Sequence, residues 1–232
     1  MKPTLFLFLA LLLSACAPAT ATNTPTPFAN TPTPSEPTAT VSFITPIASA
    51  TSTPHLGAET NALFTANNIQ LGTPKCNGKP TPAQTEGPYY TPNTPERNSL
   101  LEPGITGQRL LVVGYVFDEN CQLIPGARLD FWQTDSNGIY DNAGYHLRGH
   151  QYTDWEGRYF LETIYPGEYT GRTLHIHVKA QATSESDMLA TQLYFPKISD
   201  NTRDPLFDSA LVVRLETLGE TLVAYFNFVL AK

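Results

Sequence analysis

The stretch GRYFLETIYPGEYTGRTLHIHVKA, residues 157–180, contains two strand-like runs with a turn between them. GRYFLETI and TLHIHVKA are the runs, and the Pro-Gly pair in YPGE marks the turn. Alternate side chains of a strand share a face, so His175 and His177 should project together while Ile176 faces the other side. The stretch therefore predicts a β-structure that carries two imidazoles on one face of a strand.

Short runs of the same kind lie on both sides of this stretch. They are RLLVVGYVFD (109–118), RLDFWQTD (128–135), IYD (139–141) and MLATQLYF (188–195). The end, LVVRLETLGETLVAYFNFVLA (211–231), predicts two strands with a turn near Gly219. Runs this short and this closely spaced predict an all-β sandwich over residues 74–232, which is long enough for one core.

The first residues predict export from the cytoplasm. MKPTLFLFLALLLSAC (1–16) has a lysine, an apolar run that is too short to span a membrane, and small residues before a cysteine. We interpret residues 1–15 as a signal peptide. The ending LSAC resembles the bacterial lipobox, which implies that Cys16 is lipidated and anchors an extracytoplasmic lipoprotein to a membrane. The alternative is an ordinary cleaved signal in which Cys16 has no role.

A linker is expected between the anchor and the folded domain. From Ala17 to about Pro54 the chain is rich in proline and threonine and has almost no charge, which predicts an extended, disordered stalk. We assign residues 16–73 to this lipidated linker. Within it, ETNALFTANNIQL (59–71) is compatible with a short helix or with more linker.

Charge and cysteine content narrow the possibilities further. The formal net charge is -7 and no basic run is present, which argues against a nucleic-acid partner. Besides Cys16 the chain has Cys76 and Cys121. Outside the cytoplasm such a pair favours a disulfide, and the alternatives are two buried thiols or, less favoured, a metal site.

The two histidines are half of a possible metal site, although an H-x-H pair alone is a weak signal. The competing interpretation places one ring in a polar pocket and the other in solvent. Tyr140 and Tyr169 each follow a turn, where a side chain can be presented to a site. A phenol has a pKa near 10, so a tyrosine ligand needs an ion that strongly stabilises its anion. Histidines together with tyrosines therefore favour a hard ion such as Fe(III) over zinc.

Four segments together resemble the intradiol ring-cleavage dioxygenases, the family of catechol 1,2- and protocatechuate 3,4-dioxygenases. The segments are TEGPYY (85–90), IPGARLDFWQTDSNGIY (124–140), GRYFLETIYPGEYTGRTLHIH (157–177) and ATQLYFP (190–196). The resemblance implies the family's antiparallel, prealbumin-like β-sandwich. It also implies one non-haem Fe(III) per chain, held by Tyr140, Tyr169, His175 and His177.

The same resemblance implies the reaction. A small aromatic diol of the catechol type and O2 would be the substrates, and the ring would open between the two hydroxylated carbons to a cis,cis-muconate-type product. Tyr169 would give way to the substrate and accept a proton. Arg172 would contact the substrate and stabilise negative charge on the ring, and Tyr89 and Tyr90 would line the entrance.

The chain also departs from the well-known members of the family. Only five residues separate Tyr169 from His175, and there is no room for a helical dimerisation domain before the core. We therefore expect the secreted, short-loop branch, with a shallow site. One alternative is a non-catalytic, surface-anchored, transthyretin-like binding module, which gives no reason for two tyrosines and two histidines to occur together. A second alternative is a metal-binding protein that holds iron but has no turnover, which the short loops would allow.

Other residues are expected to lie outside the site. His146 and His150 are predicted in a loop between the two tyrosines, and Trp132 is predicted in the core. Asp200 and Asp204 are predicted in a polar loop.

Overall fold

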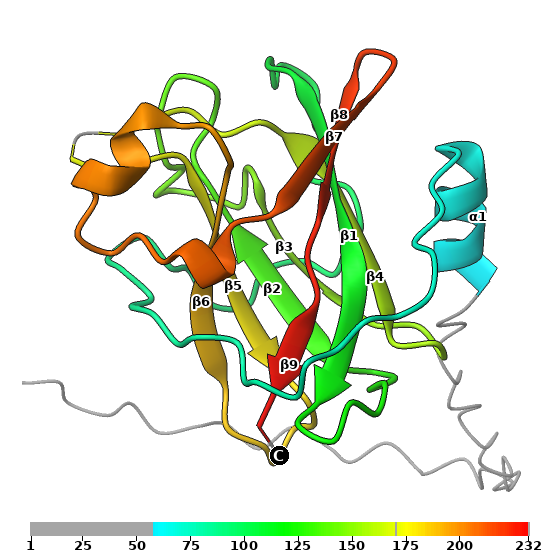
Figure 1. Cartoon of the computed structure of the whole chain (residues 1–232). Helices are drawn as coiled ribbons and strands as arrows, with labels where there is room; N and C mark the ends of the chain where they lie inside the picture. The colour runs from blue at the N-terminus through cyan, green and yellow to red at the C-terminus, as the bar shows by residue number, and fades with distance from the viewer. Residues whose placement is uncertain (1–57, 170, 232) are drawn as a thin grey trace, which may run out of the picture. The chain divides into compact units, whose positions relative to one another are not determined.

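The computed structural model describes residues 58–169 and 171–231. The predicted signal peptide, the predicted lipidation site at Cys16 and the predicted linker up to residue 57 lie outside the described residues. Two β-sheets pack face to face, with a hydrophobic core between them (Figure 1). The predicted all-β sandwich is therefore confirmed. Within the described part of the chain, no helix is long and apolar enough to cross a membrane.

The sheets differ in strand direction. The first contains β4 (Arg158–Ile164), β1 (Arg109–Asp118), β8 (Thr221–Tyr225) and β7 (Arg214–Leu218), with β9 (Phe228–Leu230) also paired to β1. The second contains β3 (Arg148–Tyr152), β2 (Arg128–Trp132), β5 (His175–Gln181) and β6 (Leu189–Tyr194). The second sheet is antiparallel throughout, as expected. The first is mixed, because β8 and β9 both run parallel to β1.

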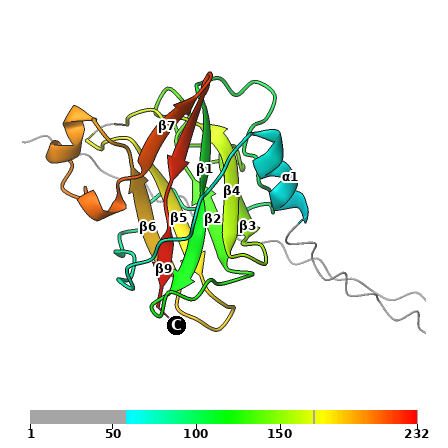
Figure 2. The ribbon, with the colours of Figure 1, turned by 45° about the vertical axis from the view of Figure 1, so that its right-hand side comes forward.

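A short helix covers the outer face of the first sheet. It is α1 (Ala58–Ala66), seen beside β4 in Figure 2. Phe64 is 6% exposed, and its ring meets that of Phe160 edge-on with centroids 5.6 Å apart. Of the two alternatives for residues 59–71, the structure shows the helix. The packed residues thus begin before position 74, where we expected the domain to start.

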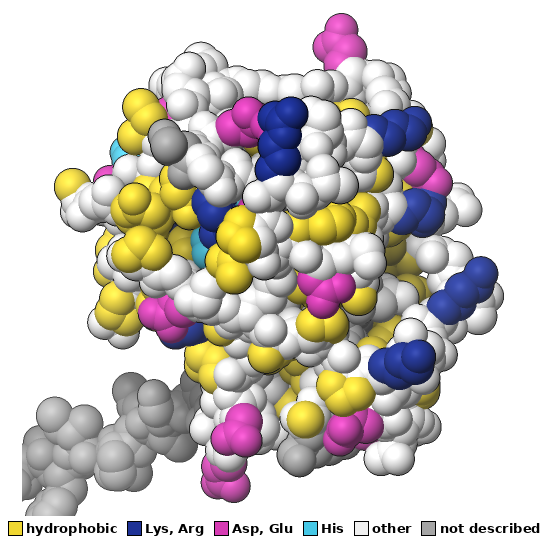
Figure 3. Space-filling model, turned by 60° about the vertical axis from the view of Figure 1, so that its left-hand side comes forward, with side chains coloured by type: hydrophobic (Ala, Val, Ile, Leu, Met, Phe, Trp, Pro, Cys, Tyr) yellow, Lys and Arg dark blue, Asp and Glu magenta, His cyan; other side chains and the backbone are white. Residues whose placement is uncertain are grey.

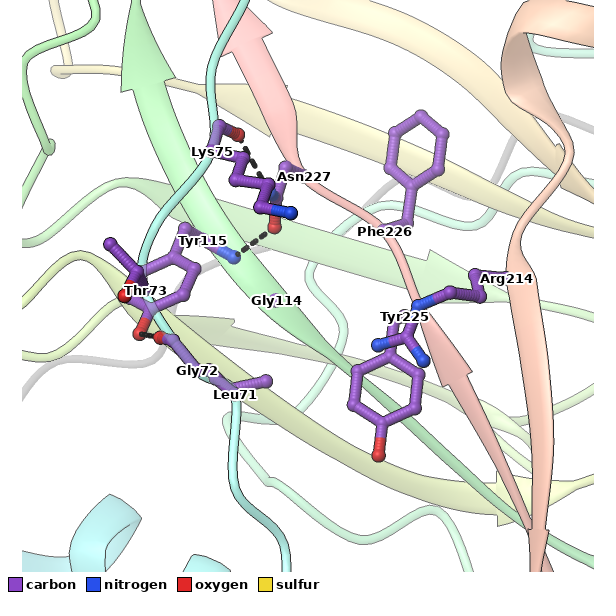
Figure 4. Close-up of a pocket in the computed structure, with 10 residues that line it drawn as sticks. All are labelled: Leu71, Gly72, Thr73, Lys75, Gly114, Tyr115, Arg214, Tyr225, Phe226 and Asn227. Carbon is purple, nitrogen blue, oxygen red and sulfur yellow. Dashed lines mark hydrogen bonds between the residues drawn. The ribbon is translucent and has the colours of Figure 1, made fainter.

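The segment after α1 is tied to the sheet by hydrogen bonds (Figure 4). The Tyr115 hydroxyl donates to the Gly72 carbonyl at 3.0 Å. The Asn227 side chain accepts from the Tyr115 N–H at 3.0 Å and donates to the Lys75 carbonyl at 2.9 Å. Asn227 lies where β1 changes partner from β8 to β9, so its amide replaces the backbone pairing that is interrupted there.

Cys76 and Cys121 form a disulfide, with Cα atoms 5.6 Å apart. It joins the segment that precedes the sheets to the turn after β1. Of the three alternatives for these cysteines, the disulfide is the one that the structure shows.

The strand assignments needed three corrections. His150 lies on β3 and not in a loop, because β3 pairs through its backbone with β2 despite its few apolar residues. Residues 139–141 are not a strand, because the Asp135 carboxylate accepts the N–H groups of residues 137 and 139 and holds a turn. The C-terminus forms the predicted hairpin at Gly219 but then adds a third strand, β9.

Candidate functional site

The site lies on the outer face of the second sheet and not between the sheets. His175 and His177 point away from the core, whereas Ile176 is fully buried in it, which confirms the predicted alternation. Trp132 lies opposite His177 on β2, and the two rings stack with centroids 4.7 Å apart. In Figure 3 a histidine and a basic side chain meet in a hollow bordered by hydrophobic side chains.

Three donor atoms converge at this place. The Nδ1 of His175 donates to the Thr173 carbonyl at 2.7 Å, so its Nε2 carries a lone pair toward the site. That Nε2 lies 3.1 Å from the Nε2 of His177 and 3.4 Å from the Oη of Tyr140. Ligands about 2.0–2.1 Å from one ion, with bond angles of about 90–110°, lie roughly 2.9–3.4 Å apart. The separations thus fit three ligands of a single metal ion.

Two glycines bring the tyrosines together. Gly138 has φ +80°, and a Cβ there would lie 1.8 Å from the Glu168 carbonyl oxygen. A Cβ on Gly167 would lie 2.4 Å from the Gly138 nitrogen. The turns before Tyr140 and Tyr169 therefore meet backbone to backbone, which only glycine permits at both positions. The two tyrosine rings lie edge to face as a result, with centroids 5.5 Å apart.

Tyr169 is more exposed than the other three candidate ligands. It is half-buried, whereas Tyr140, His175 and His177 are buried. Its ring lies 5.8 Å from that of His175, and its hydroxyl is 3.5 Å from Nη1 of Arg172. The structure thus brings all four candidate ligands together, with Tyr169 on the more accessible side, next to Arg172.

Arg172 is held by partners that the sequence did not reveal. Its Nε donates to both carboxylate oxygens of Asp204, at 2.8 and 3.0 Å, and its Nη2 donates to Gln192 at 2.5 Å. Burial lowers the pKa of Arg172, but the hydrogen bond and charge of Asp204 outweigh this and leave it above its usual value. We predicted a polar loop at Asp204, whereas its side chain is 1% exposed. No local motif marks it, because its role depends on contact with a residue distant in sequence.

The two tyrosines of TEGPYY have different surroundings. The Tyr89 ring stacks on Tyr140 with centroids 4.5 Å apart and meets the Tyr169 ring edge-on at 5.9 Å. The Tyr90 ring instead contacts Trp132, and its hydroxyl donates to Asp130 at 3.2 Å. Tyr89 therefore contacts the candidate ligands directly. Tyr90 contacts Trp132, which in turn stacks on His177.

A buried arginine near the site was also missed. Arg148 is 0% exposed and donates to the carbonyls of Tyr89, at 2.6 Å, and Asp141, at 2.7 and 3.0 Å. It thus joins the Tyr89 segment to the loop that follows Tyr140. The residues on either side of Arg148 in the sequence form no motif that would predict this bridging role.

Burial favours the neutral forms of Tyr140, His175 and His177 in the absence of a cation. Burial, and next the proximity of Tyr169, raises the pKa of Tyr140. Burial lowers the pKa of His175 to about 4 and that of His177 well below its usual value. A cation among these groups would reverse the effect on tyrosine by stabilising the phenolate, and neutral imidazoles are ready to bind it. The donor set and its surroundings therefore fit Fe(III).

Cavities border the site on two sides. Tyr169 and Arg172 line one of about 380 Å³, and Tyr140 lines another of about 530 Å³. Both volumes lie in the range of small-molecule sites, about 300–1,000 Å³.

Known proteins are similar to this chain in sequence and in fold. A protein-family model described as dioxygenase matches residues 85–231. The protocatechuate 3,4-dioxygenase alpha chain of Pseudomonas putida is 30% identical over 169 residues, 62% of this chain and 82% of that protein. The solved dioxygenase domain of a dioxygenase carbohydrate-binding protein fusion from the cellulolytic bacterium Streptomyces sp. SirexAA-E is 49% identical. Its TM-score is 0.64, and the match covers 66% of this chain and 99% of that one.

A solved structure with lower sequence identity has a similar fold. An intradiol ring-cleavage dioxygenase from Tetranychus urticae is 25% identical, with a TM-score of 0.59 over 65% of this chain and 94% of that one. The chain therefore belongs to the intradiol ring-cleaving dioxygenase family, and it is an oxidoreductase. The resemblance read from the four sequence segments is confirmed. Membership of an enzyme family also sets aside the alternative of a non-catalytic binding module.

The buried histidines predict that the metal-free protein loses stability in acid. The pKa of His175 falls from 6.5 to about 4 on folding, because burial disfavours the charged ring. Between these values the unfolded chain binds a proton that the folded chain does not, so the free energy of unfolding decreases as the pH falls from 6.5. We expect a loss of roughly 3 kcal/mol at pH 4 from this group, and none above pH 6.5. Urea denaturation of metal-free protein across this range measures it.

The matched variant is His175→Gln, which removes the titrating ring. Its free energy of unfolding should depend less steeply on pH between about 6.5 and 4. Equal slopes in the two proteins would contradict a neutral, buried His175.

Proposed function

We propose that the protein is an Fe(III)-dependent dioxygenase that cleaves a catechol-type ring with O2, between the two hydroxylated carbons, to a cis,cis-muconate-type product. The observation that carries the proposal is the convergence of Tyr140 Oη with the Nε2 atoms of His175 and His177. It occurs in a chain that belongs to the intradiol family and matches a protocatechuate 3,4-dioxygenase chain.

Four side chains would hold the iron: Tyr140, Tyr169, His175 and His177. The Thr173 carbonyl fixes the His175 tautomer by accepting from Nδ1, and Trp132 fixes the plane of His177 by stacking on it. An Fe(III) ion held by these side chains would supply Lewis-acid chemistry for the bound diol.

Tyr169 is the residue that we assign to proton transfer. It is the most exposed of the four, and its hydroxyl lies 3.5 Å from Nη1 of Arg172. Its oxygen would receive the proton of a substrate hydroxyl. Tyr140 is buried and stacked against Tyr89, so we assign it to holding the ion throughout the reaction.

Arg172 and Tyr89 would act on the organic substrate. The guanidinium is fixed beside Tyr169, where it can stabilise negative charge as it develops on the ring. Tyr89 provides an aromatic wall next to Tyr140, which suits a flat substrate.

We also propose that the protein works outside the cytoplasm, anchored to a membrane through a lipid on Cys16. The Cys76–Cys121 disulfide supports an oxidising compartment. Labelling of the full-length chain with a radioactive fatty acid tests the anchor. We expect label on the natural chain and none on Cys16→Ser, and equal labelling would contradict the proposal.

Loss of a ligand should abolish turnover. We expect Tyr140→Phe and His177→Ala to lower the rate of catechol cleavage by more than about 100-fold, beyond the effect of losing a residue that merely supports a ligand. Oxygen consumption together with absorbance of the muconate product measures the rate.

Tyr152→Phe is the control, because it removes a tyrosine hydroxyl from the other end of the same sheet face, where the side chain is 36% exposed. Its rate should stay within about twofold of the natural protein. A rate of catechol cleavage equal to that of the natural protein in either Tyr140→Phe or His177→Ala would contradict the ligand assignment.

A further inference from the structure

Asp204 is a buried carboxylate in a segment to which we assigned no function. It follows a 3-10 helix, η1 (Ser199–Arg203), and its side chain is 1% exposed. Besides Arg172, the backbone N–H groups of Thr173 and Leu206 donate to it, at 3.1 and 2.9 Å. A carboxylate with this many fixed donors is rigidly placed.

This fixed carboxylate determines which face of Arg172 is free. The Nε of Arg172 donates its hydrogen bonds to Asp204, and the Nη2 donates to Gln192. The Nη2 also lies 3.4 Å from the Tyr194 hydroxyl. Nη1 is the remaining nitrogen, and it is directed at the Tyr169 hydroxyl. The guanidinium therefore presents one nitrogen to the site and cannot rotate without breaking charge-assisted bonds to Asp204.

We propose that Asp204 is a positioning residue for the reaction, which holds Arg172 so that Nη1 faces the reacting ring. Without it the arginine keeps its charge but loses its direction. Electrostatic stabilisation depends on such orientation, since a fixed donor needs no reorganisation when charge develops. The kinetic part of this inference rests on the proposed function, whereas the structural part concerns Arg172 alone.

The experiment compares Asp204→Asn with the natural protein, both loaded with iron. An amide can still accept from Arg172, but its NH2 group would face the N–H of Thr173 or Leu206. Removing an electrostatic donor outright costs about 10²–10³ in kcat, so we expect loss of its orientation to lower kcat about tenfold or more. We expect KM, iron content and the tyrosinate absorption band to change little. A kcat within about twofold of the natural value, or loss of iron in parallel with activity, would overturn the proposal.

Two further variants separate positioning from general damage. Asp200→Asn is the matched control, because Asp200 pairs with Arg203, whose side chain is 80% exposed, and it should leave kcat unchanged. In an Arg172→Ala background, Asp204→Asn should change kcat by less than about twofold, because Asp204 acts through Arg172. Equal losses in both backgrounds would contradict this.

Hydrogen exchange of the Arg172 Nε–H in iron-free protein gives a readout that does not depend on activity. The signal is identified by its absence in Arg172→Ala. We expect slow exchange in the natural protein and in Asp200→Asn, and fast exchange in Asp204→Asn. Equal exchange in all three would overturn the inference whatever the activity. If exchange behaves as expected but no protein cleaves catechols, the proposed function fails and the positioning of Arg172 stands.

Discussion

The close approach of two turns, at Gly138 and Gly167, is the constraint on which the site depends. Backbone meets backbone there, and a side chain on either glycine would overlap the opposite turn. Because the turns touch, Tyr140 and Tyr169 are delivered to the same place from different parts of the chain. Strand β5 brings the histidines there independently, since its alternation alone turns both away from the core.

The environment of the site opposes charge on its own ligands. Burial makes the phenolate of Tyr140 and the imidazolium forms of both histidines unfavourable. A hard cation suits such an environment. It can replace the proton of the phenol and stabilise the resulting phenolate, and it can bind the lone pairs of the neutral imidazole rings. Arg172 differs from these ligands, because it is a partly buried cation whose charge is already balanced by the buried carboxylate of Asp204. The site therefore contains one fixed positive group for the substrate and a neutral set of donors for the ion.

The sequence predicted what depends on local pattern. Strand runs, the hairpin at Gly219 and the shared face of His175 and His177 follow from alternation and turn residues, and the structure has each of them. Strand β3 was missed because its sequence, RGHQY, has few apolar residues and it is held by backbone pairing to β2. The parallel pairing of β8 and β9 with β1 was missed because the relative direction of two strands far apart in sequence depends on the path of the chain between them, which no local pattern shows. Asp204 and Arg148 were missed for a related reason, since their roles exist only through contacts between distant segments.

The proposed ring cleavage depends most on two tyrosines and two histidines binding one Fe(III). A visible absorption spectrum of the iron-loaded protein, recorded without oxygen before and after adding catechol, tests this most directly. Tyrosinate bound to Fe(III) absorbs broadly in the visible range, so the protein should be coloured, and the band should shift when catechol binds the ion. A protein that stays colourless after iron loading would contradict the ligand set and leave the family fold without the proposed metal site.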